Sequence, residues 1–326
     1  MRKLTSIEYC AGAGGQALGL EKAGFKHLLL VDDDAHCCAT LRHNRPRWNV
    51  VLQDMRTSSG VEYDGVDLFA GGLPCPPFSV AGKQLGKKDE RNLFDDALRI
   101  ISECNPKFVL IENVRGFLDK SFDDFRTELK HSFKIMGYEC DWKLLHSSNF
   151  GVSQLRPRVA IVAAQKAYWS AFSFPESKRG KPKTVGRLLQ DLMAENGWQG
   201  AAEWAQKANT IAPTIVGGSK KHGGPDLGPT RARNAWAKLG VEGRTNAYDA
   251  PVAGFDGMPR LTTKMAARVQ GFPDTWEITG KKTNAYRQVG NAFPPAVAEA
   301  LGKQIANAIR VVELGLGDKA TSVAAE

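Results

Sequence analysis

Short apolar runs alternate with amphipathic stretches along the first half of the chain. Apolar runs of four to eight residues indicate buried strands, and apolar residues spaced three and four apart indicate helices. The pattern predicts strands at residues 4–9, 27–31, 50–52, 66–69 and 108–111, and helices at 16–23, 36–44, 93–103 and 122–136. This alternation is typical of repeated βα units. We therefore expect an α/β fold with a doubly wound, mostly parallel, Rossmann-like sheet.

Two later segments, YECDWKLLH and RVAIVAA, resemble strands without a helix between them, so we expect an antiparallel pair at one sheet edge. In the region that follows, Gly, Pro and Trp punctuate short irregular stretches. A helical pattern returns near the end, after two prolines that suit a helix start. The expected domains are a catalytic and ligand-binding domain at 1–165, a small irregular lobe at 166–258, and a return to the first domain at 259–326, where the last helix packs on the sheet.

Composition narrows the class of protein. With 42% apolar and 24% charged residues among 326, the chain has an ordinary globular composition. Its six cysteines form no C-x-x-C pair and all lie in the first 140 residues, which fits neither a zinc site nor a secreted disulfide framework. No window approaches the roughly 20 apolar residues of a membrane span. We expect a cytoplasmic protein with no membrane partner and no metal.

The net charge is +9, and residues 166–258 hold 13 basic against 8 acidic residues, so 13 minus 8 gives +5 in that region. A modest basic excess suits a polyanionic partner but also occurs on ordinary soluble enzymes. This region is therefore the candidate for contacting phosphates.

A glycine loop follows the first strand in the segment YCAGAGGQALG, with Gly12, Gly14 and Gly15 placed before a helix. Glycines let a ligand approach the backbone closely. Enzymes that bind dinucleotides, flavins or S-adenosylmethionine all place glycines here, and the loop lacks the Lys-Ser/Thr pair of a phosphate-binding loop. Asp32 and Asp54 end the next two strands, where they could bind a ribose and an adenine amine. Alternatively, the acids of this region, namely Asp32, Asp33, Asp34 and Asp54, only cap the following helices.

A second loop, LPCPPFSVAGKQLGKKDERNLF, is long, irregular and rich in Gly, Pro and Lys. Cys75 stands at its start between Pro74 and Pro76, beyond the carboxyl edge of the sheet, where ligands bind in open α/β folds. A free Cys is usually a small buried apolar residue, and we interpret the other five cysteines in that way. The flanking prolines favour a nucleophile at Cys75.

Glu112 and Asn113 end the fifth predicted strand, so a carboxylate lies beside Cys75 if the fourth and fifth strands are neighbours. Further on, Arg156 and Arg158 alternate along an extended segment and share one face, so both could pair with Glu112. Alternatively, Glu112 is an acid at a helix N-terminus and the arginines form a solvated edge.

The order of these segments resembles the DNA (cytosine-5) methyltransferase family in its compact bacterial form. The segments that carry the resemblance are YCAGAGG, VDDDA, LPCPPFS, ENV, QLRPR, LTTKMAARVQGFPD and YRQVGNAFPPAVA, and they span nearly the whole chain. The resemblance implies a nucleophile that adds to C6 of a flipped cytosine, so that C5 takes the methyl group of S-adenosylmethionine. S-adenosylhomocysteine, the C5 proton and the thiolate then leave. A base that is buried in the duplex stack must be flipped out to react.

The same resemblance assigns the site residues. The implied catalytic residues are Cys75, Glu112, Arg156 and Arg158. The implied S-adenosylmethionine-binding residues are Tyr9, Ala11, Gly12, Gly14, Asp32, Asp33, Asp54, Met55, Pro74 and Asn291. The lobe is implied to be the target-recognition domain, and the candidate nucleic-acid contacts are Ser79, Lys83, Gln154, Thr214, Lys220, Lys221, Arg231 and Arg233. The basic residues could read guanine edges or grip phosphates. Gly290 and Asn291 could also be a plain turn before the final helix.

The chain departs from the family pattern at Pro76, at Asp32 and at the Lys264-Met265 pair, where glutamine, glutamate and Arg-Glu are customary. None of these changes removes a reacting group. We expect a monomeric enzyme that acts on double-stranded DNA, with a possible cognate restriction endonuclease. The alternatives are an RNA cytosine-5 methyltransferase, a catalytically idle DNA-binding protein and, from the glycine loop alone, a nicotinamide-dependent oxidoreductase.

Overall fold

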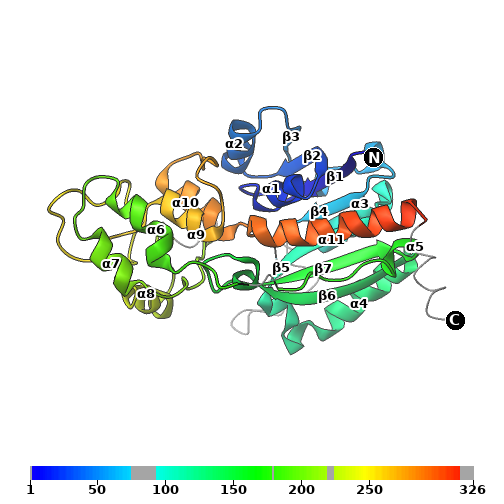
Figure 1. Ribbon diagram of the computed structural model, residues 1–326. Coiled ribbons are helices and arrows are strands. Elements are labelled where there is room, and N and C mark those ends of the chain that lie inside the picture. Colours follow the sequence, from blue (N-terminus) through cyan, green and yellow to red (C-terminus); the bar gives the residue numbers. More distant parts are fainter. Residues whose placement is uncertain (1, 75–92, 178–179, 219–223, 316–326) are drawn as a thin grey trace.

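The computed structural model describes residues 2–74, 93–177, 180–218 and 224–315 (Figure 1). Its centre is a seven-stranded sheet in the order β3-β2-β1-β4-β5-β7-β6. The strands are β1 Leu4–Tyr9, β2 Phe25–Asp32, β3 Val50–Leu52, β4 Leu68–Gly71, β5 Phe108–Val114, β6 Tyr138–His146 and β7 Pro157–Gln165. The first five strands pair in parallel, whereas β7 pairs antiparallel with both β5 and β6. The predicted parallel sheet and its antiparallel edge pair are confirmed.

Helices cover both faces of the sheet and form a smaller body beside it (Figure 1). Their bounds are α1 Gly15–Lys22, α2 Ala35–Asn44, α3 Phe94–Cys104, α4 Asp123–Ile135, α5 Lys166–Trp169, α6 Val185–Ala194, α7 Ala201–Lys207, α8 Thr230–Ala237, α9 Thr263–Gln270, α10 Lys282–Asn291 and α11 Pro295–Glu313. The four helices predicted in the first half are α1 to α4, with ends within two residues of the predicted ones.

The two faces of the sheet have separate cores because successive side chains of a strand point to opposite sides. On one face, Ile7 and Phe69 pack with residues of α3 and α4. On the other face, Leu4 and Ala70 pack with residues of α1 and α11. Helix α11 begins at Pro295. Proline is favoured in the first turn of a helix, because the N–H that it lacks would have no partner within the helix there.

Residues 166–258, which the sequence predicts to be irregular, include the helices α6, α7 and α8. The prediction is therefore wrong for these three segments. These helices have seven to ten residues, and helices of that length depend on packing rather than on intrinsic propensity. The side chains of Trp204 and Trp236 are buried in their common core. We call α6–α10, with the described segments between them, the small lobe; it lies at the left in Figure 1.

Two contacts bear on where the lobe begins and ends. Helix α5, which follows β7, belongs to the sheet side, because the rings of Tyr168 and Phe172 lie against Phe108. Helices α9 and α10 share a core with α6 and α7. The domain boundaries at 165 and 258 stay a prediction.

Candidate active site

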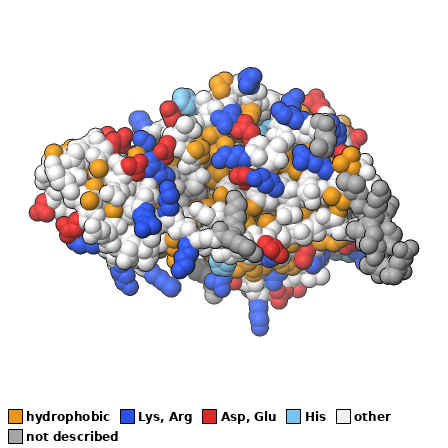
Figure 2. Space-filling model, in the orientation of Figure 1, with side chains coloured by type: hydrophobic (Ala, Val, Ile, Leu, Met, Phe, Trp, Pro, Cys, Tyr) orange, Lys and Arg blue, Asp and Glu red, His pale blue; other side chains and the backbone are white. Residues whose placement is uncertain are grey.

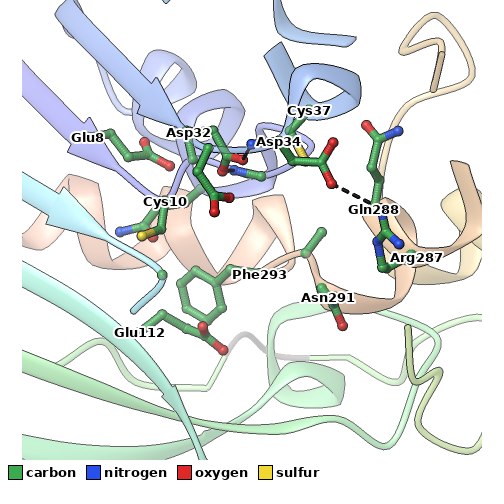
Figure 3. Close-up of a pocket in the computed structure, with 16 residues that line it drawn as sticks. Glu8, Cys10, Asp32, Asp34, Cys37, Glu112, Arg287, Gln288, Asn291 and Phe293 are labelled. Atoms are coloured by element: carbon green, nitrogen blue, oxygen red, sulfur yellow. Dashed lines mark hydrogen bonds and ion pairs between the residues drawn. The ribbon is translucent and has the colours of Figure 1, made fainter. Parts of the chain in front are cut away.

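A cavity of about 220 Å³ opens where β1, β2 and β5 end, facing α1 and α10 (Figure 3). Its lining residues are Glu8, Cys10, Ala11, Gly12, Gln16, Asp32, Asp33, Asp34, Cys37, Gly72, Glu112, Arg287, Gln288, Asn291, Ala292 and Phe293. Ligands of open α/β folds bind at this edge of the sheet. The glycine loop, the aspartates and Glu112 therefore meet in one place, as their positions at the ends of predicted strands indicate.

Asp32 fixes the shape of the glycine loop. Its carboxylate accepts hydrogen bonds from the Gly12 N–H at 2.8 Å and from the Asp34 N–H at 2.9 Å. Gly12 has a φ of +54°, a left-handed conformation that glycine adopts without strain. Burial raises the pKa of Asp32, and the two backbone donors partly offset that rise. Asp32 thus holds the loop and faces the cavity at the same time.

A second cavity of about 370 Å³ adjoins the first one and shares Cys10, Asp32, Asp33 and Asn291 with it. Its other lining residues are Val31, Gln53, Asp54, Met55, Arg56, Pro74 and Leu93. The two cavities together form an elongated site along the carboxyl edge of β1 and β2. That shape suits a ligand with two unlike halves.

Helix capping explains part of the acidic pattern. Asp34 accepts from the His36 N–H at the start of α2, and Asp54 accepts from the Arg56 N–H at the start of a 3-10 helix. The Asp54 carboxylate also pairs with the Arg56 guanidinium at 2.6 Å, and this interaction lowers the pKa of Asp54. Asp34 and Asp54 thus both cap a helix, as the alternative interpretation predicts. Asp54 nevertheless lines the second cavity.

Two of the residues assigned to the methyl donor do not line either cavity. Tyr9 is buried and stacks on Phe69, with 5.6 Å between the ring centroids. A Cβ at Gly14 would lie 2.6 Å from Leu41 and 2.8 Å from Trp276, so this glycine serves the packing of α1. Cys10, the neighbour of Tyr9, lines both cavities instead.

Glu112 and Arg158 form an ion pair, with 2.6 Å between Arg158 Nε and Glu112 Oε1. Glu112 is buried, and burial raises its pKa, while the charge of Arg158 partly offsets the rise. Strand β5 lies beside β4, as the sequence interpretation requires. Asn113 of β5 donates from Nδ2 to the Leu73 carbonyl at 3.4 Å, just before the loop of Cys75. The carboxylate is therefore placed where that loop begins.

Arg156 has different partners from those that the sequence suggests. It is fully buried, and its guanidinium donates to the carbonyls of Ile215 at 2.6 Å, Gly290 at 2.8 Å and Ala292 at 3.0 Å. The expected pairing with Glu112 is made by Arg158. Arg156, just before β7, instead joins the sheet domain to the small lobe at Ile215 and at the end of α10. The sequence places both arginines on one face of an extended segment, so it could not show which of them pairs with Glu112.

The candidate nucleic-acid contacts fall into three groups. Gln154 is fully buried and bonds Gln270 and the Ile215 N–H, so the structure does not present it to DNA. Thr214 is half-buried and donates to the Leu155 carbonyl. Arg231 is exposed and Arg233 is half-buried on α8. Figure 2 shows Lys and Arg side chains over both the lobe and the sheet domain on one face.

Five sequence-predicted site residues lie outside the described residues: Cys75, Ser79, Lys83, Lys220 and Lys221. Within the part of the chain that the structure describes, no group of three or more His, Cys, Asp or Glu could hold a metal ion. No helix in the same part is long and apolar enough to cross a membrane.

Sequence reasoning missed several cavity residues, among them Glu8, Gln16 and Arg287. Glu8 and Gln16 are buried polar side chains, and Arg287 reaches the cavity from α10 and pairs with Asp34 at 3.0 Å. The sequence did contain one signal, because Glu8 is an acidic residue inside an otherwise apolar strand. A buried charge without a reason is rare, so such a position deserves a functional hypothesis.

Comparisons with known proteins place the chain in a family. The family model for C-5 cytosine-specific DNA methylase matches residues 4–307. The chain is 52% identical to the Type II methyltransferase M.NgoMIV of Neisseria gonorrhoeae, covering 94% of this chain and 99% of that protein. It is also 52% identical to the Type II methyltransferase M.NaeI of Lentzea aerocolonigenes, covering 95% of this chain and 76% of that protein.

The fold is similar to that of the S. pombe Dnmt2 methyltransferase, with a TM-score of 0.63 at 17% identity over 96% of this chain and 99% of that one. The matched segment contains the glycine loop, the Glu112–Arg158 pair and the small lobe. The chain therefore belongs to the C-5 cytosine-specific DNA methylase family.

Proposed function

We propose that this DNA (cytosine-5) methyltransferase modifies one cytosine in a specific duplex sequence, with Cys75 as the nucleophile and with Glu112 and Arg158 holding the base. The observation that carries the proposal is the position of Glu112, which pairs with Arg158 and lines the cavity beside the glycine loop. A methyl donor and a flipped base could thus approach each other at this edge of the sheet.

The elongated site suits S-adenosylmethionine as the methyl donor. Asp32, at the end of β2, has the position of a ribose-binding acid in Rossmann-like folds. Met55 and Pro74 give the second cavity apolar walls for an adenine, and Asn291 lies between the two cavities. The donor supplies an electrophilic methyl group on a sulfonium. Ala11 and Gly12 would bring the backbone close to its amino-acid part.

The base would be held through its own hydrogen-bonding edge. A carboxyl such as that of Glu112 can bind N3 and the exocyclic amine of cytosine together, which favours a protonated ring during attack. Because burial raises the pKa of Glu112, this carboxyl can carry a proton more readily than an exposed one. Arg158 limits that rise and orients the carboxyl. Cys75 then attacks C6, the activated C5 takes the methyl group, and loss of the C5 proton expels the thiolate.

The partners follow from the same proposal. Duplex DNA would lie across the small lobe, with Arg231, Arg233 and the basic residues near 220 as candidate contacts. The relatives at 52% identity are named Type II methyltransferases, so we propose that this chain also belongs to a restriction-modification system, with a cognate endonuclease for the same site. It would act as a monomer in the cytoplasm.

The direct test compares wild-type protein with Cys75→Ser in transfer of labelled methyl groups to duplex DNA. Transfer should fall to background, whereas Cys140→Ser, a half-buried cysteine on β6, should keep wild-type activity. Bisulfite sequencing of DNA from expressing cells then reports the modified base and its sequence. Unchanged transfer by Cys75→Ser, or labelling of RNA in preference to duplex DNA, would contradict the proposal.

A further inference from the structure

Helix α8 has one apolar side and one polar side. Trp236 is fully buried in the core of the small lobe, whereas Arg231, Asn234 and Lys238 are exposed. Lys238 follows the helix as its C-cap and keeps helical dihedral angles. Residues three, four and seven apart lie above one another along a helix, so these three polar side chains share one face. The burial of Trp236 thus fixes which face of α8 points away from the lobe.

The two arginines of α8 have different surroundings. Arg233 is half-buried, its guanidinium donates to Thr230 Oγ1 at 3.2 Å, and its Cγ would lie 3.2 Å from a Cβ at Gly243. Arg233 therefore packs on the lobe itself. Arg231 is exposed, and no carboxylate among the described residues pairs with it. Helix α8 also contains no acidic residue, so the cation of Arg231 is available to a partner.

A short series of contacts connects α8 to the base site. Thr214 donates to the Leu155 carbonyl, and Leu155 precedes Arg158 by three residues. A Cβ at Gly228 would lie 2.7 Å from Val216 Cγ2, so the segment that leads into α8 packs on the segment of Thr214. Helix α8 lies at the lower edge of the lobe in Figure 1, and Lys and Arg side chains protrude along that edge in Figure 2. The exposed face of α8 is therefore accessible to a duplex whose base enters the site.

We propose that α8 enters the major groove of the DNA, where Arg231 reads one guanine of the recognition sequence and Lys238 binds a phosphate. This inference rests on the proposed function, which places duplex DNA against the lobe, and it adds the residue that selects a base. An α-helix fits the major groove, and a guanidinium can donate two hydrogen bonds to O6 and N7 of guanine.

The positions of the two cations distinguish their roles. Residues near the N-terminus of a helix in the major groove contact the base edges. Arg231 is the second residue of α8, whereas Lys238 lies beyond its last turn. A lysine ammonium is a compact charge without the planar fork of arginine, which suits a phosphate. Ala235 lies on the same face between them, and its small side chain allows the helix to approach the groove closely.

The test uses a pool of duplexes in which each position of the wild-type recognition sequence is varied, and bisulfite sequencing reports which duplexes are methylated. Arg231→Ala should lose about 10-fold or more of the preference for guanine at one position and keep the preference at the others. Lys238→Ala should weaken binding of every sequence by a similar factor. It should also reduce the slope of log affinity against log salt concentration by about one.

Lys207→Ala is the control, because this exposed cation on α7 already pairs with Glu203, and it should keep the wild-type preference and affinity. Undiminished preference at every guanine in Arg231→Ala, or an equal loss for all sequences, would overturn base reading by Arg231. An unchanged salt slope in Lys238→Ala would refute the phosphate contact. Should Arg231→Ala not fold, Arg231→Gln takes its place with the same expected loss. If the wild type methylates no duplex at all, the proposed function itself fails.

Discussion

Arg158 Nε lies 2.6 Å from Glu112 Oε1, although the two residues are not directly opposite each other in the sheet. In the antiparallel register of β5 and β7, Glu112 pairs with Ala160 and Arg158 pairs with Val114. Residues two positions apart in register project from the same face, within reach of long side chains. The ion pair therefore exists because β7 runs antiparallel to β5 in this one register.

Glu112→Gln should slow methyl transfer by about 100-fold or more, the usual contribution of a positioned acid or base. The amide keeps the size of the carboxyl but can neither pair with Arg158 nor exchange a proton with the base. Single-turnover transfer to duplex DNA measures the chemical step, and calorimetry with S-adenosylhomocysteine checks that the cavity is intact. Transfer at the wild-type rate would exclude a catalytic role for Glu112.

Arg156→Ala should destabilise the protein by about 3 kcal/mol or more, because three buried carbonyls lose their donor. The free energy of unfolding in urea measures this loss. Arg260→Ala is the matched control, since this half-exposed arginine forms a single ion pair with Glu242, and it should cost less than about 1 kcal/mol. Similar losses in the two variants would show that Arg156 does not join the lobe to the sheet.

Asp67 should make the protein sensitive to acid. Burial alone would raise its pKa, but hydrogen bonds from Arg2 and Lys107 outweigh burial and lower the pKa to about 2. A folded-state pKa below the unfolded value stabilises the protein above about pH 4, and this stabilisation is lost as the pH falls towards 2.

Asp67→Asn should therefore cost roughly 1–2 kcal/mol at pH 7, and the difference from the wild type should shrink between about pH 4 and 2. Urea unfolding at a series of pH values gives the curve. Asp141→Asn, which removes a carboxylate from an exposed pair with Lys130, should show a small difference at every pH. A cost for Asp67→Asn that does not depend on pH would contradict the prediction.

Gly19→Ala should destabilise the protein, although alanine favours helices by up to about 1 kcal/mol over glycine. A Cβ at this position in α1 would lie 2.4 Å from the Pro295 carbonyl oxygen and 2.5 Å from the Ala298 Cβ, both on α11. We expect a loss of about 1–3 kcal/mol from this overpacking. Thermal or urea unfolding measures it.

Gly116→Ala is the control for this substitution, because the nearest atom to a Cβ there is 3.8 Å away. It should change stability by less than about 0.5 kcal/mol. If Gly19→Ala is as stable as the wild type, α1 and α11 are able to move apart without cost, and the close contact between them is not needed.

Local patterns predicted the framework of the site correctly. Apolar runs and helical spacing located the strands and helices of the sheet domain, because both signals depend on neighbouring residues. Glu112 and Asp32 were identified as cavity residues from their positions at strand ends, since the carboxyl ends of parallel strands share one edge of a sheet. The same reasoning could not find α6, α7 and α8, which depend on packing around Trp204 and Trp236.

The sequence by itself determined the parallel sheet, the edge pair and the set of acids that meet at one end of the sheet. Only the tertiary structure decided which of the two arginines pairs with Glu112, because the partners of Arg156 are three carbonyls from two distant segments of the chain. It also revealed that Glu8 faces the cavity. The same physical reason applies to the partner of Glu112 and to the position of Glu8. Strand periodicity fixes which side of the sheet a residue faces, whereas the partners of that residue depend on segments that meet only when the chain has folded.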